Sequence, residues 1–341
     1  MDNNIGISII VCCYNSAKRL PQTILHLAKQ IVPEGLLWEV IIVDNNSKDN
    51  TAEVANNEWE LYKLNIPFKI VEQTMPGLSF AREKGIDTAK YEYLLFCDDD
   101  NWLCNTYVEQ SFNILNKHPD VSLVGGGGEY VCEGKPPVWF DEFSGSYATG
   151  QQLKESGIAP RNITFYGAGA VIRKKDYLNL DNKNFKFLLS GRQGKKLLTG
   201  EDRELCYAFI LNGKQLYYDS NLKFKHFIPK ERHTFSYYSN MMYNCVPASI
   251  ILHCYNLNVI NIYNRRSATK NSYYWCLLML IIQNIKHFLA IIIPYIKKRH
   301  WQFLWMEIIL IIKYITYWLK NKRLFSDTFN NIRNAEYNQY K

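Results

Sequence analysis

Short apolar runs recur through the N-terminal part of the chain at the length of buried β-strands. They are ISIIVCC at 7–13, EVIIVD at 39–44, a run around 68–71, and LLFC directly before the three aspartates at 98–100. Runs of this length, rich in β-branched residues and bounded by turn residues, are typical of strands that are covered on both faces. The pattern therefore predicts four strands in this part of the chain.

The segments between these runs carry the spacing of helices. Leu20, Ile24, Leu27 and Ile31 recur at three- and four-residue intervals after the first run, and a further helix is expected over 79–89. Apolar residues at this spacing form one face of a helix. The resulting βαβαβαβ order predicts an α/β fold with a mostly parallel sheet covered by helices.

Carboxylates follow two of the predicted strands. Asp44 ends the second strand, and Asp98, Asp99 and Asp100 end the fourth. Taken alone, three aspartates can form a solvated turn or cap the next helix. Open α/β sheets, however, bind ligands at the carboxyl ends of their strands, and crowded carboxylates need donors or a hard cation to compensate them. The position of these carboxylates therefore favours a ligand site, and the rest of the sequence indicates whether the ligand is a nucleotide.

The composition is that of a globular chain with a basic balance. Apolar residues make up 47% and charged residues 21% of the 341 residues, and the formal net charge is +8. This excludes a disordered chain and suggests an anionic partner. The positive charge is concentrated beside apolar segments and not along a base-reading stripe, so we expect no nucleic-acid partner.

The nine cysteines are scattered without a CxxC pair, and several lie within apolar runs. This pattern favours reduced core residues over a zinc site or a disulfide framework. The N-terminus MDNNIGISIIVCC shows no secretory signal. We therefore expect a cytoplasmic protein.

Two common nucleotide-binding motifs are missing. The sequence has no GxxxxGK[ST] phosphate loop, and no GxGxxG follows the first predicted strand. These absences count against a P-loop NTPase and a dinucleotide-binding Rossmann domain. The glycine run at 125–128 follows an apolar strand at 121–124, and we interpret it as a tight turn or a close backbone approach.

Four spaced blocks carry a family resemblance. IIVCCYNSAKRLPQTI, VIIVDNNSKDNT, GLSFAREKGIDTAKYEYLLFCDDD and GEDRELCYAFILNG occur in this order. Together they resemble the glycosyltransferase family 2 enzymes, which have the GT-A fold, and the likeness covers about 5–230. It implies a GT-A catalytic domain over 1–230 and leaves a helical region over 231–341. It also implies inverting, metal-dependent transfer of a sugar from a nucleotide donor to a hydroxyl.

The resemblance assigns several residues to the donor. Asp44 matches the acidic residue that recognises the base, commonly uracil, and Tyr14 and Asn15 match the loop on the other side of the base. Arg82 matches a basic residue that reaches the base or diphosphate, although a surface arginine paired with Glu83 is the alternative. We therefore expect a UDP-sugar as the favoured donor.

The aspartate run supplies the implied metal site. In the family, the first and third acids of a DxD pattern face the metal and donor, which here are Asp98 and Asp100. Asp99 would be a neighbour or a ribose contact. His226 stands where some relatives place a histidine near the metal or diphosphate, with His233 as a competitor. We expect Mn²⁺ or Mg²⁺ held by Asp100 and His226.

The block at 199–205 implies the base. By resemblance, Asp202 is the general base that takes the proton from the acceptor hydroxyl, and Glu201 binds the acceptor or orients the loop. Acids are also favoured in a first helical turn for purely structural reasons. Gly169, with Gly167 and Ala168, resembles a small-residue strand that lets donor and acceptor approach, and a bulge is the alternative.

The C-terminal region carries two long apolar segments. One spans 271–296, where Lys286 and His287 interrupt it. The other spans 301–320, where one helical face carries an apolar stripe of Trp301, Leu304, Trp305, Ile308, Ile312, Ile315 and Leu319. Basic residues flank both: Arg265, Arg266 and Lys270 before, Lys297, Lys298 and Arg299 between, and Lys320, Lys322 and Arg323 after. Such segments suit helices in the surface of an anionic bilayer. The alternative is a helical pair packed on the catalytic domain or on a second subunit.

These expectations combine into one hypothesis. The protein would transfer a hexose or N-acetylhexosamine to a lipid-linked or growing surface polysaccharide, at the inner face of the cell membrane and in contact with it through 271–323. The alternatives are a non-catalytic sugar-nucleotide-binding scaffold and a metal-dependent nucleotidyltransferase.

Overall fold

A nine-stranded mixed sheet forms the centre of the computed structural model, which describes residues 4–189, 199–264 and 271–340. The strand order is β3-β2-β1-β4-β8-β6-β9-β5, with β7 paired to β9. The strands are β1 Gly6–Cys13, β2 Leu37–Asp44, β3 Phe68–Glu72, β4 Tyr93–Asp98, β5 Asn101–Leu103, β6 Val121–Cys132, β7 Gly157–Ile158, β8 Val171–Arg173 and β9 Gln215–Ile228.

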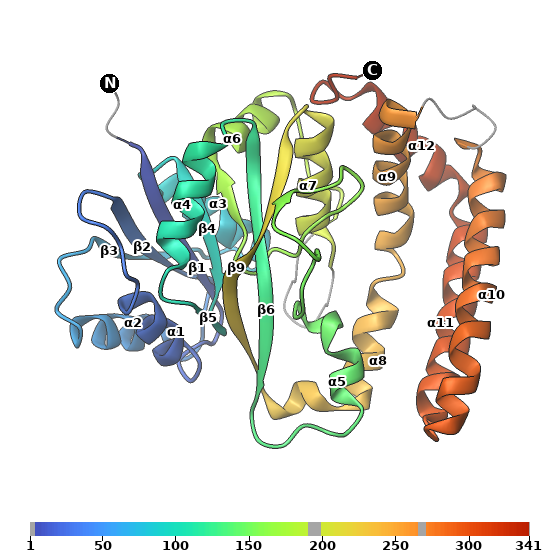
Figure 1. Ribbon diagram of the computed structural model, residues 1–341, viewed down its shortest axis with the longest axis horizontal. Helices are drawn as coiled ribbons and strands as arrows, with labels where there is room; N and C mark the ends of the chain where they lie inside the picture. The colour runs from blue at the N-terminus through green and yellow to red at the C-terminus, as the bar shows by residue number, and fades with distance from the viewer. Residues whose placement is uncertain (1–3, 190–198, 265–270, 341) are drawn as a thin grey trace.

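The first four strands and the helices between them lie where the apolar pattern predicts them. β3, β2, β1 and β4 are parallel neighbours. The helices of this half and of the sheet's flanks are α1 Leu20–Ala28, α2 Thr51–Glu60, α3 Leu78–Thr88, α4 Tyr107–Lys117, α5 Phe140–Phe143, η1 Ser144–Tyr147, α6 Lys174–Asn182 and α7 Glu201–Leu211 (Figure 1). Side chains of β1 enter apolar clusters on both faces of the sheet, which explains its unbroken apolar run.

The glycine run lies inside β6 and is not a turn. A Cβ added at Gly126 would come within 2.0 Å of the Leu222 carbonyl oxygen in β9, and one at Gly128 within 2.4 Å of the Ala148 carbonyl oxygen. The interpretation as a tight turn is therefore wrong, and the close backbone approach is correct. Glycine here lets β6 and β9 pair along most of their length.

Gly126→Ala is expected to destabilise the fold by about 2 kcal/mol or more, because the added methyl group meets backbone and not a movable side chain. Gly127→Ala is the matched control. Its Cβ would have its nearest neighbours at 3.5 and 3.7 Å, which is ordinary contact. Urea unfolding of both variants checks the prediction, and equal midpoints would contradict it.

Five helices follow the sheet. After η2 Lys230–His233 they are α8 Phe235–Asn244, α9 Ala248–Asn264, α10 Tyr273–Lys297, α11 Trp301–Lys320 and α12 Lys322–Asn334. α10 and α11 form a hairpin that stands beside α8 and α9 on the side of the molecule far from β3 (Figure 1). By length and composition, α10 and α11 could each cross a membrane, with mean hydropathies of 2.1 and 1.3, and the bent pair of α8 and α9 could form a third span.

α11 has two apolar stripes. The inner one, with Phe303, Met306 and Trp318, is buried against the rest of the protein. The outer one is exposed and includes Trp301 and Trp305, with Ile312 and Leu319 farther along. The sequence predicts the outer stripe and, as an alternative, packing of this helix on the catalytic domain. The structure has both an exposed stripe and a packed one, because α11 is apolar on two sides. The basic residues Arg265, Arg266 and Lys270 lie outside the described residues.

Candidate active site

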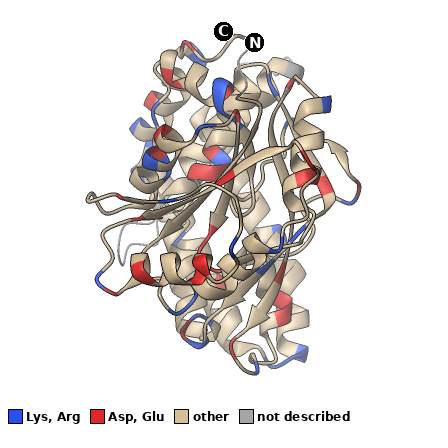
Figure 2. Ribbon diagram, turned by 90° about the vertical axis from the view of Figure 1, so that its left-hand side faces the viewer, with Lys and Arg blue, Asp and Glu red and all other residues tan. Residues whose placement is uncertain are grey.

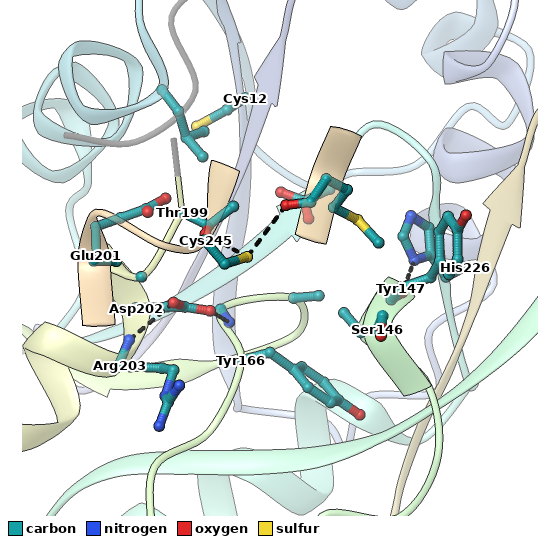
Figure 3. A pocket seen from close by; sticks show the side chains of 18 of the residues that line it. Cys12, Ser146, Tyr147, Tyr166, Thr199, Glu201, Asp202, Arg203, His226 and Cys245 are labelled. Carbon is teal, nitrogen blue, oxygen red and sulfur yellow. Dashed lines mark hydrogen bonds between the residues drawn. The ribbon is translucent and has the colours of Figure 1, made fainter. Parts of the chain in front are cut away.

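A cavity of about 980 Å³ opens at the carboxyl ends of β1 and β4. Its walls come from the loops after these strands, the start of α3, the turns at 145–148 and 166–168, the start of α7, and the helices α8 and α9 (Figure 3). Ligands of open α/β sheets bind at this edge. The cavity is therefore where the sequence places the carboxylates.

Asp44 and Asp98 end the two strands that flank β1. Asp44 is level with Cys13 and Asp98 with Cys12, so both carboxylates lie at the same edge of the sheet. Asp98 lines the cavity. Asp44 is half-buried, and its Oδ1 accepts a hydrogen bond from the Ser47 backbone amide at 3.1 Å. Its neighbour Asn45 is the residue of this turn that lines the cavity.

The Tyr14–Asn15 loop is tied to the turn after Asp44. Asn15 has a left-handed backbone (φ 50°). Its amide donates to Ser47 Oγ at 3.0 Å, and the Lys48 amide donates to Asn15 Oδ1 at 2.7 Å. Tyr14 is 48% exposed and lines the cavity. The two loops assigned to the nucleotide base are thus one hydrogen-bonded unit, and Asn15 holds it together while Tyr14 is free to contact a ligand.

Asp99 is held by the protein itself. It accepts hydrogen bonds from Ser16 Oγ and from Arg19 Nη2, the latter at 2.5 Å. Burial, together with the nearby Asp100 carboxylate, raises the pKa of Asp99 to about 6. Its carbonyl oxygen accepts from Thr23 Oγ1 at 2.8 Å. Asp99 therefore anchors the loop after β1 and the start of α1, as the neighbour alternative expected. Sequence analysis missed Ser16 and Arg19, although both stand in its first block.

Asp100 lies beside two cationic groups. Its Oδ1 is 3.5 Å from His226 Nε2, and its Oδ2 is 3.2 Å from Arg232 Nη1. Burial alone would raise the pKa of Asp100, but His226 and Arg232 lower it below its usual range. The pairing of β5 with β9 creates this contact, because Asn101 is level with His226. Two residues 126 positions apart in sequence are therefore brought together, as the hypothesis of a shared metal site requires.

The two histidines have different surroundings. His226 Nδ1 contacts the Tyr147 carbonyl oxygen at 2.6 Å, which leaves Nε2 directed toward Asp100 (Figure 3). His233 contacts the Ile228 carbonyl oxygen through Nε2 at 2.7 Å and packs on Phe140. His233 is thus a structural residue, and His226 is the candidate for the cavity.

The pair of Asp100 and His226 fits a divalent cation. A histidine that ligates metal through one ring nitrogen usually donates its other N–H to a carbonyl or carboxylate, as His226 can to Tyr147. In the described part of the chain, no group of three or more His, Cys, Asp or Glu side chains could hold a metal ion. Mg²⁺ commonly takes only one or two protein carboxylates and completes its shell with substrate phosphates and water. Asp100 and the nearby Asp98 could supply such carboxylates, and His226 would add a nitrogen ligand.

Asp202 begins α7 and faces the same cavity. Its Oδ2 accepts a hydrogen bond from the Gly167 amide at 2.7 Å, and its Oδ1 accepts from the Arg203 amide at 2.8 Å (Figure 3). Gly200, with φ 112°, turns the chain into the helix directly before it. The carboxylate is thereby fixed by two backbone donors. Fixed geometry of this kind suits a group that must meet a substrate proton.

Arg82 and Glu201 complete this wall. Arg82 Nη1 is 3.6 Å from Glu201 Oε1, and its guanidinium lies over the Phe96 ring at 5.4 Å. Its partner is therefore Glu201, and the alternative pairing with Glu83 on the helix surface is wrong. A Cβ at Gly167 would lie 2.9 Å from Arg82 Nη2 and 3.2 Å from Asp202 Cβ. The absence of a side chain at Gly167 thus lets the Arg82 guanidinium and the Asp202 side chain both lie close to its backbone.

Gly169 has a conformational role. Its φ is 70°, its carbonyl accepts from Tyr107 Oη at 2.7 Å, and a Cβ there would lie 2.5 Å from the same oxygen. Gly167 and Ala168 line the cavity, whereas Gly169 forms the turn behind them. Gly169 thus lies in a turn before β8 and not in a strand, and the small residues that border the cavity are Gly167 and Ala168.

Glu204 is a buried carboxylate that the sequence did not single out. It is fully buried one helical turn after Glu201, and it accepts hydrogen bonds from the amides of Leu188 and Leu189 and from Tyr255 Oη, all within 3.0 Å. Burial raises the pKa of Glu204 to about 7. It ties α7, and hence Asp202, to α9.

Glu204 should make stability depend on pH near neutrality. Because its pKa in the folded protein lies above the ordinary value of 4.5, its contribution is complete at low pH and is lost as the pH rises through about 7. Between about pH 4.5 and about pH 7 the melting temperature of the wild type should therefore decrease relative to that of Glu204→Gln. Scanning calorimetry across this range measures both slopes, and parallel slopes would contradict the assignment.

One wall of the cavity could not be predicted from the sequence. It contains Met241 of α8, Cys245 directly after α8, Leu252 and Asn256 of α9, and Tyr314 of α11. These positions follow 230, where the resemblance ends. The catalytic domain and the helical region therefore share one cavity, and no short motif signals that contribution.

Sequence comparisons find relatives of this chain among glycosyltransferases. AglE, a glycosyltransferase of Haloferax volcanii, is 30% identical over 160 residues, which are 46% of this chain and 49% of AglE. TarP of Staphylococcus aureus, named a poly(ribitol-phosphate) β-N-acetylglucosaminyltransferase, is 26% identical over 212 residues, which are 61% of this chain and 58% of TarP. The chain spans less than two thirds of the length of the curated relatives it matches.

Solved structures share the fold. The crystal structure of S. aureus TarS 1–349 in complex with UDP covers 96% of this chain and 90% of its own, with a TM-score of 0.52 and 15% identity. The complex of the same protein with UDP-GlcNAc has a TM-score of 0.52 and 16% identity. The expected GT-A-type α/β fold with C-terminal helices is therefore confirmed. A family model, Glycosyl transferase family 2, matches residues 8–180, about half of the chain. The chain belongs to glycosyl transferase family 2.

Proposed function

We propose that the protein transfers a hexose or N-acetylhexosamine from a nucleotide-sugar, with a UDP-sugar as the favoured donor, to a hydroxyl group, with inversion at the anomeric carbon. The observation that carries this proposal is the placement of Asp202 in the same cavity as Asp98 and Asp100. A fixed carboxylate and a diphosphate-binding edge in one cavity allow in-line displacement. Family membership supports the reaction class.

The donor would lie across the ends of β1, β2 and β4. The unit formed by the Tyr14–Asn15 loop and the turn after Asp44 would hold the base, with the Asp44 carboxylate accepting from a ring N–H. Arg82 and Arg232 would contact the diphosphate, since a guanidinium suits bidentate phosphate contacts. The UDP and UDP-GlcNAc bound by the TarS structures support a uridine donor.

Mn²⁺ or Mg²⁺ would be held by Asp100 and His226, with Asp98 nearby. Such an ion neutralises charge that grows on the departing nucleoside diphosphate. Arg232, 3.2 Å from Asp100, adds a fixed positive charge at the same place. His226 would bind as the neutral imidazole, oriented by Tyr147.

Asp202 would accept the proton of the acceptor hydroxyl as that oxygen attacks. The Gly167 and Arg203 amides hold both carboxylate oxygens, so the carboxylate is oriented before the acceptor arrives. Glu201 would keep Arg82 beside the diphosphate through their ion pair. The attack comes from the face opposite the leaving group, which inverts the configuration.

The acceptor would be a lipid-linked or growing surface polysaccharide. The names of TarP and of a poly-β-1,6-N-acetyl-D-glucosamine synthase of Staphylococcus epidermidis, 30% identical over 122 residues, support a polymer of the cell surface. The enzyme would work in the cytoplasm, at the inner face of the cell membrane, where nine free cysteines remain reduced.

We further infer that the α10–α11 hairpin lies in the membrane surface and does not span it. Phe303 stacks on Phe143 with ring centroids 4.3 Å apart, and Trp318 Nε1 donates to Ser249 Oγ at 3.1 Å, so α11 is fixed to the protein near both ends. A helix of this length extends about 30 Å, the thickness of the hydrocarbon core. A bilayer can then contact the outer stripe of α11 and the exposed apolar side chains of α10, such as Leu289 and Ile293. Charges of both signs are interspersed on the opposite side of the molecule (Figure 2).

Membrane association has a direct test. The hairpin loop carries Lys297, Lys298 and Arg299, which favour anionic lipid. Vesicles that contain phosphatidylglycerol should sediment with the protein at low salt, and binding should weaken for Trp305→Gln, which alters an exposed residue of the outer stripe. Equal recovery with and without vesicles would contradict the inference.

A nucleotide-release screen tests the reaction itself. Purified protein is incubated with detergent-solubilised lipid-linked acceptors, a panel of UDP-, GDP- and dTDP-sugars, and either Mn²⁺ or EDTA. Metal-dependent release of UDP from one donor would support the proposal. Release of pyrophosphate would favour a nucleotidyltransferase, and donor binding without any turnover would favour a binding scaffold.

A further inference from the structure

The cavity continues past Asp202 into a compartment between the catalytic domain and the C-terminal helices. We name this compartment by its six principal residues: Met241, Met242, Cys245, Leu252, Asn256 and Tyr314. It is continuous with the donor half, because both belong to one cavity of about 980 Å³. Ligand pockets commonly have volumes of about 300–1,000 Å³, so this cavity is at the upper end of that range.

The two halves of the cavity differ in charge. The donor half contains Asp98, Asp100, Arg82 and Arg232. From 235 onward, the described residues that line the cavity include no Asp, Glu, Lys or Arg. A phosphate chain in this half would lose its hydration without a cation to replace it. The compartment is therefore suited to a neutral and largely apolar group.

One polar atom in this wall has no partner. Asn256 Oδ1 is buried and makes no hydrogen bond within the described structure. A buried acceptor that is left unsatisfied costs free energy. Because this oxygen is buried from the cavity as well, a ligand could reach it only if the Asn256 side chain moved. The wall is therefore largely apolar, with Leu252 and Met242 among its residues.

The compartment borders the hairpin that we place at the membrane. Tyr314 lies in α11, one turn after Leu310 of the inner stripe. The other side of α11 exposes Trp305 and Ile312. The compartment therefore lies on the inner side of the helix whose outer side carries the exposed apolar stripe.

We propose that this compartment is the acceptor subsite, and that it takes the hydrocarbon chain next to the sugar of an acceptor anchored in the bilayer. The proposal rests on the function proposed above, because Asp202 must be the base that meets the acceptor hydroxyl. None of the six residues that define the compartment is among the residues assigned to the donor. Of the two acceptors proposed above, the neutral wall favours the lipid-linked one.

Cys245 provides a local reporter for occupancy. It is a half-buried free thiol that lines the compartment, and its Sγ lies 3.4 Å from Thr199 Oγ1 (Figure 3). Cys104, another half-buried thiol, lies outside the cavity and serves as an internal control. Alkylation of each can be followed by peptide mass spectrometry in the full-length protein.

The test compares octyl glucoside, below its micellar concentration, with methyl glucoside. Octyl glucoside should slow alkylation of Cys245 at a concentration about 30-fold lower than methyl glucoside does, because its chain is removed from water. Alkylation of Cys104 should not change. Equal protection by the two glucosides, or protection of both thiols, would overturn the proposal.

A pair of matched variants tests whether the octyl chain of the glucoside lies beside Leu252. Leu252→Gln should abolish most of the advantage of octyl glucoside, whereas Leu178→Gln, at an exposed leucine of α6, should leave it intact. An unchanged advantage in Leu252→Gln would overturn the placement. UDP binding, measured by calorimetry on the same samples, reports the donor half separately. Failure of the donor assignment would appear there while the Cys245 readout stays interpretable.

Discussion

Asp202→Asn is expected to lower the rate of sugar transfer by about 10³-fold while UDP binding stays within about twofold of the wild type. The asparagine can still accept from the Gly167 amide, so the start of α7 should keep its geometry. What it lacks is the ability to take the proton of the acceptor hydroxyl. Single-turnover transfer and calorimetry with UDP measure the two quantities separately.

Asp87→Asn is the matched control for this variant. Asp87 is an exposed aspartate of α3, so the same chemical change is made away from the cavity. Its transfer rate should equal that of the wild type. If Asp202→Asn also keeps its rate, Asp202 is not the base, and another group must take the proton of the acceptor hydroxyl.

Asp100→Asn is expected to weaken Mn²⁺-dependent binding of UDP by about 100-fold, and transfer should fall at least as far. The substitution removes the carboxylate that lies beside both His226 and Arg232. Binding of UDP in EDTA should change much less, because the proposed contacts with the uracil ring do not involve Asp100. Titration of UDP with and without Mn²⁺ measures the difference.

The contrary result for Asp100 is equally clear. If the variant binds UDP with the same Mn²⁺ dependence as the wild type, Asp100 does not hold the cation. Arg232 would then be the principal positive charge at the diphosphate, since its guanidinium stays in place. His226→Ala, measured in parallel, should resemble Asp100→Asn if the two residues share the ion.

The parallel half of the sheet could be predicted from sequence because its signals are local. β1, β2 and β4 are unbroken apolar runs, and each is followed by the turn residues that form the site. The ends of parallel strands meet at one edge, so Asp44 and Asp98 could be placed together without coordinates. The resemblance added roles for these residues but did not change their positions.

The role of Asp99 could not be predicted in the same way. Three adjacent aspartates look alike in sequence, and their surroundings separate them. Ser16 and Arg19 hold Asp99, whereas His226 and Arg232 approach Asp100 from β9 and the turn after it. The contacts of Asp100 depend on the pairing of β5 with β9. β5 has only three residues, and so short a strand has no clear pattern in the sequence.

The acceptor half escaped prediction for a different reason. Leu252, Asn256 and Tyr314 stand in apolar helices where many similar residues serve only to pack. Helical periodicity indicates that a face is apolar but not what covers it. In α11 the exposed stripe was visible in the sequence, and the second stripe, with Phe303 and Trp318, became evident only from its contacts.

The central claim is that Asp202 and the diphosphate-binding edge act on opposite faces of the donor sugar. Proton NMR of the product's anomeric centre tests this most directly, with an α-linked UDP-sugar as the donor and the acceptor identified by the nucleotide-release screen. The account predicts a β-linked product, formed by a single in-line displacement. An α-linked product would contradict it, because retention needs a second displacement or attack from the face of the leaving group.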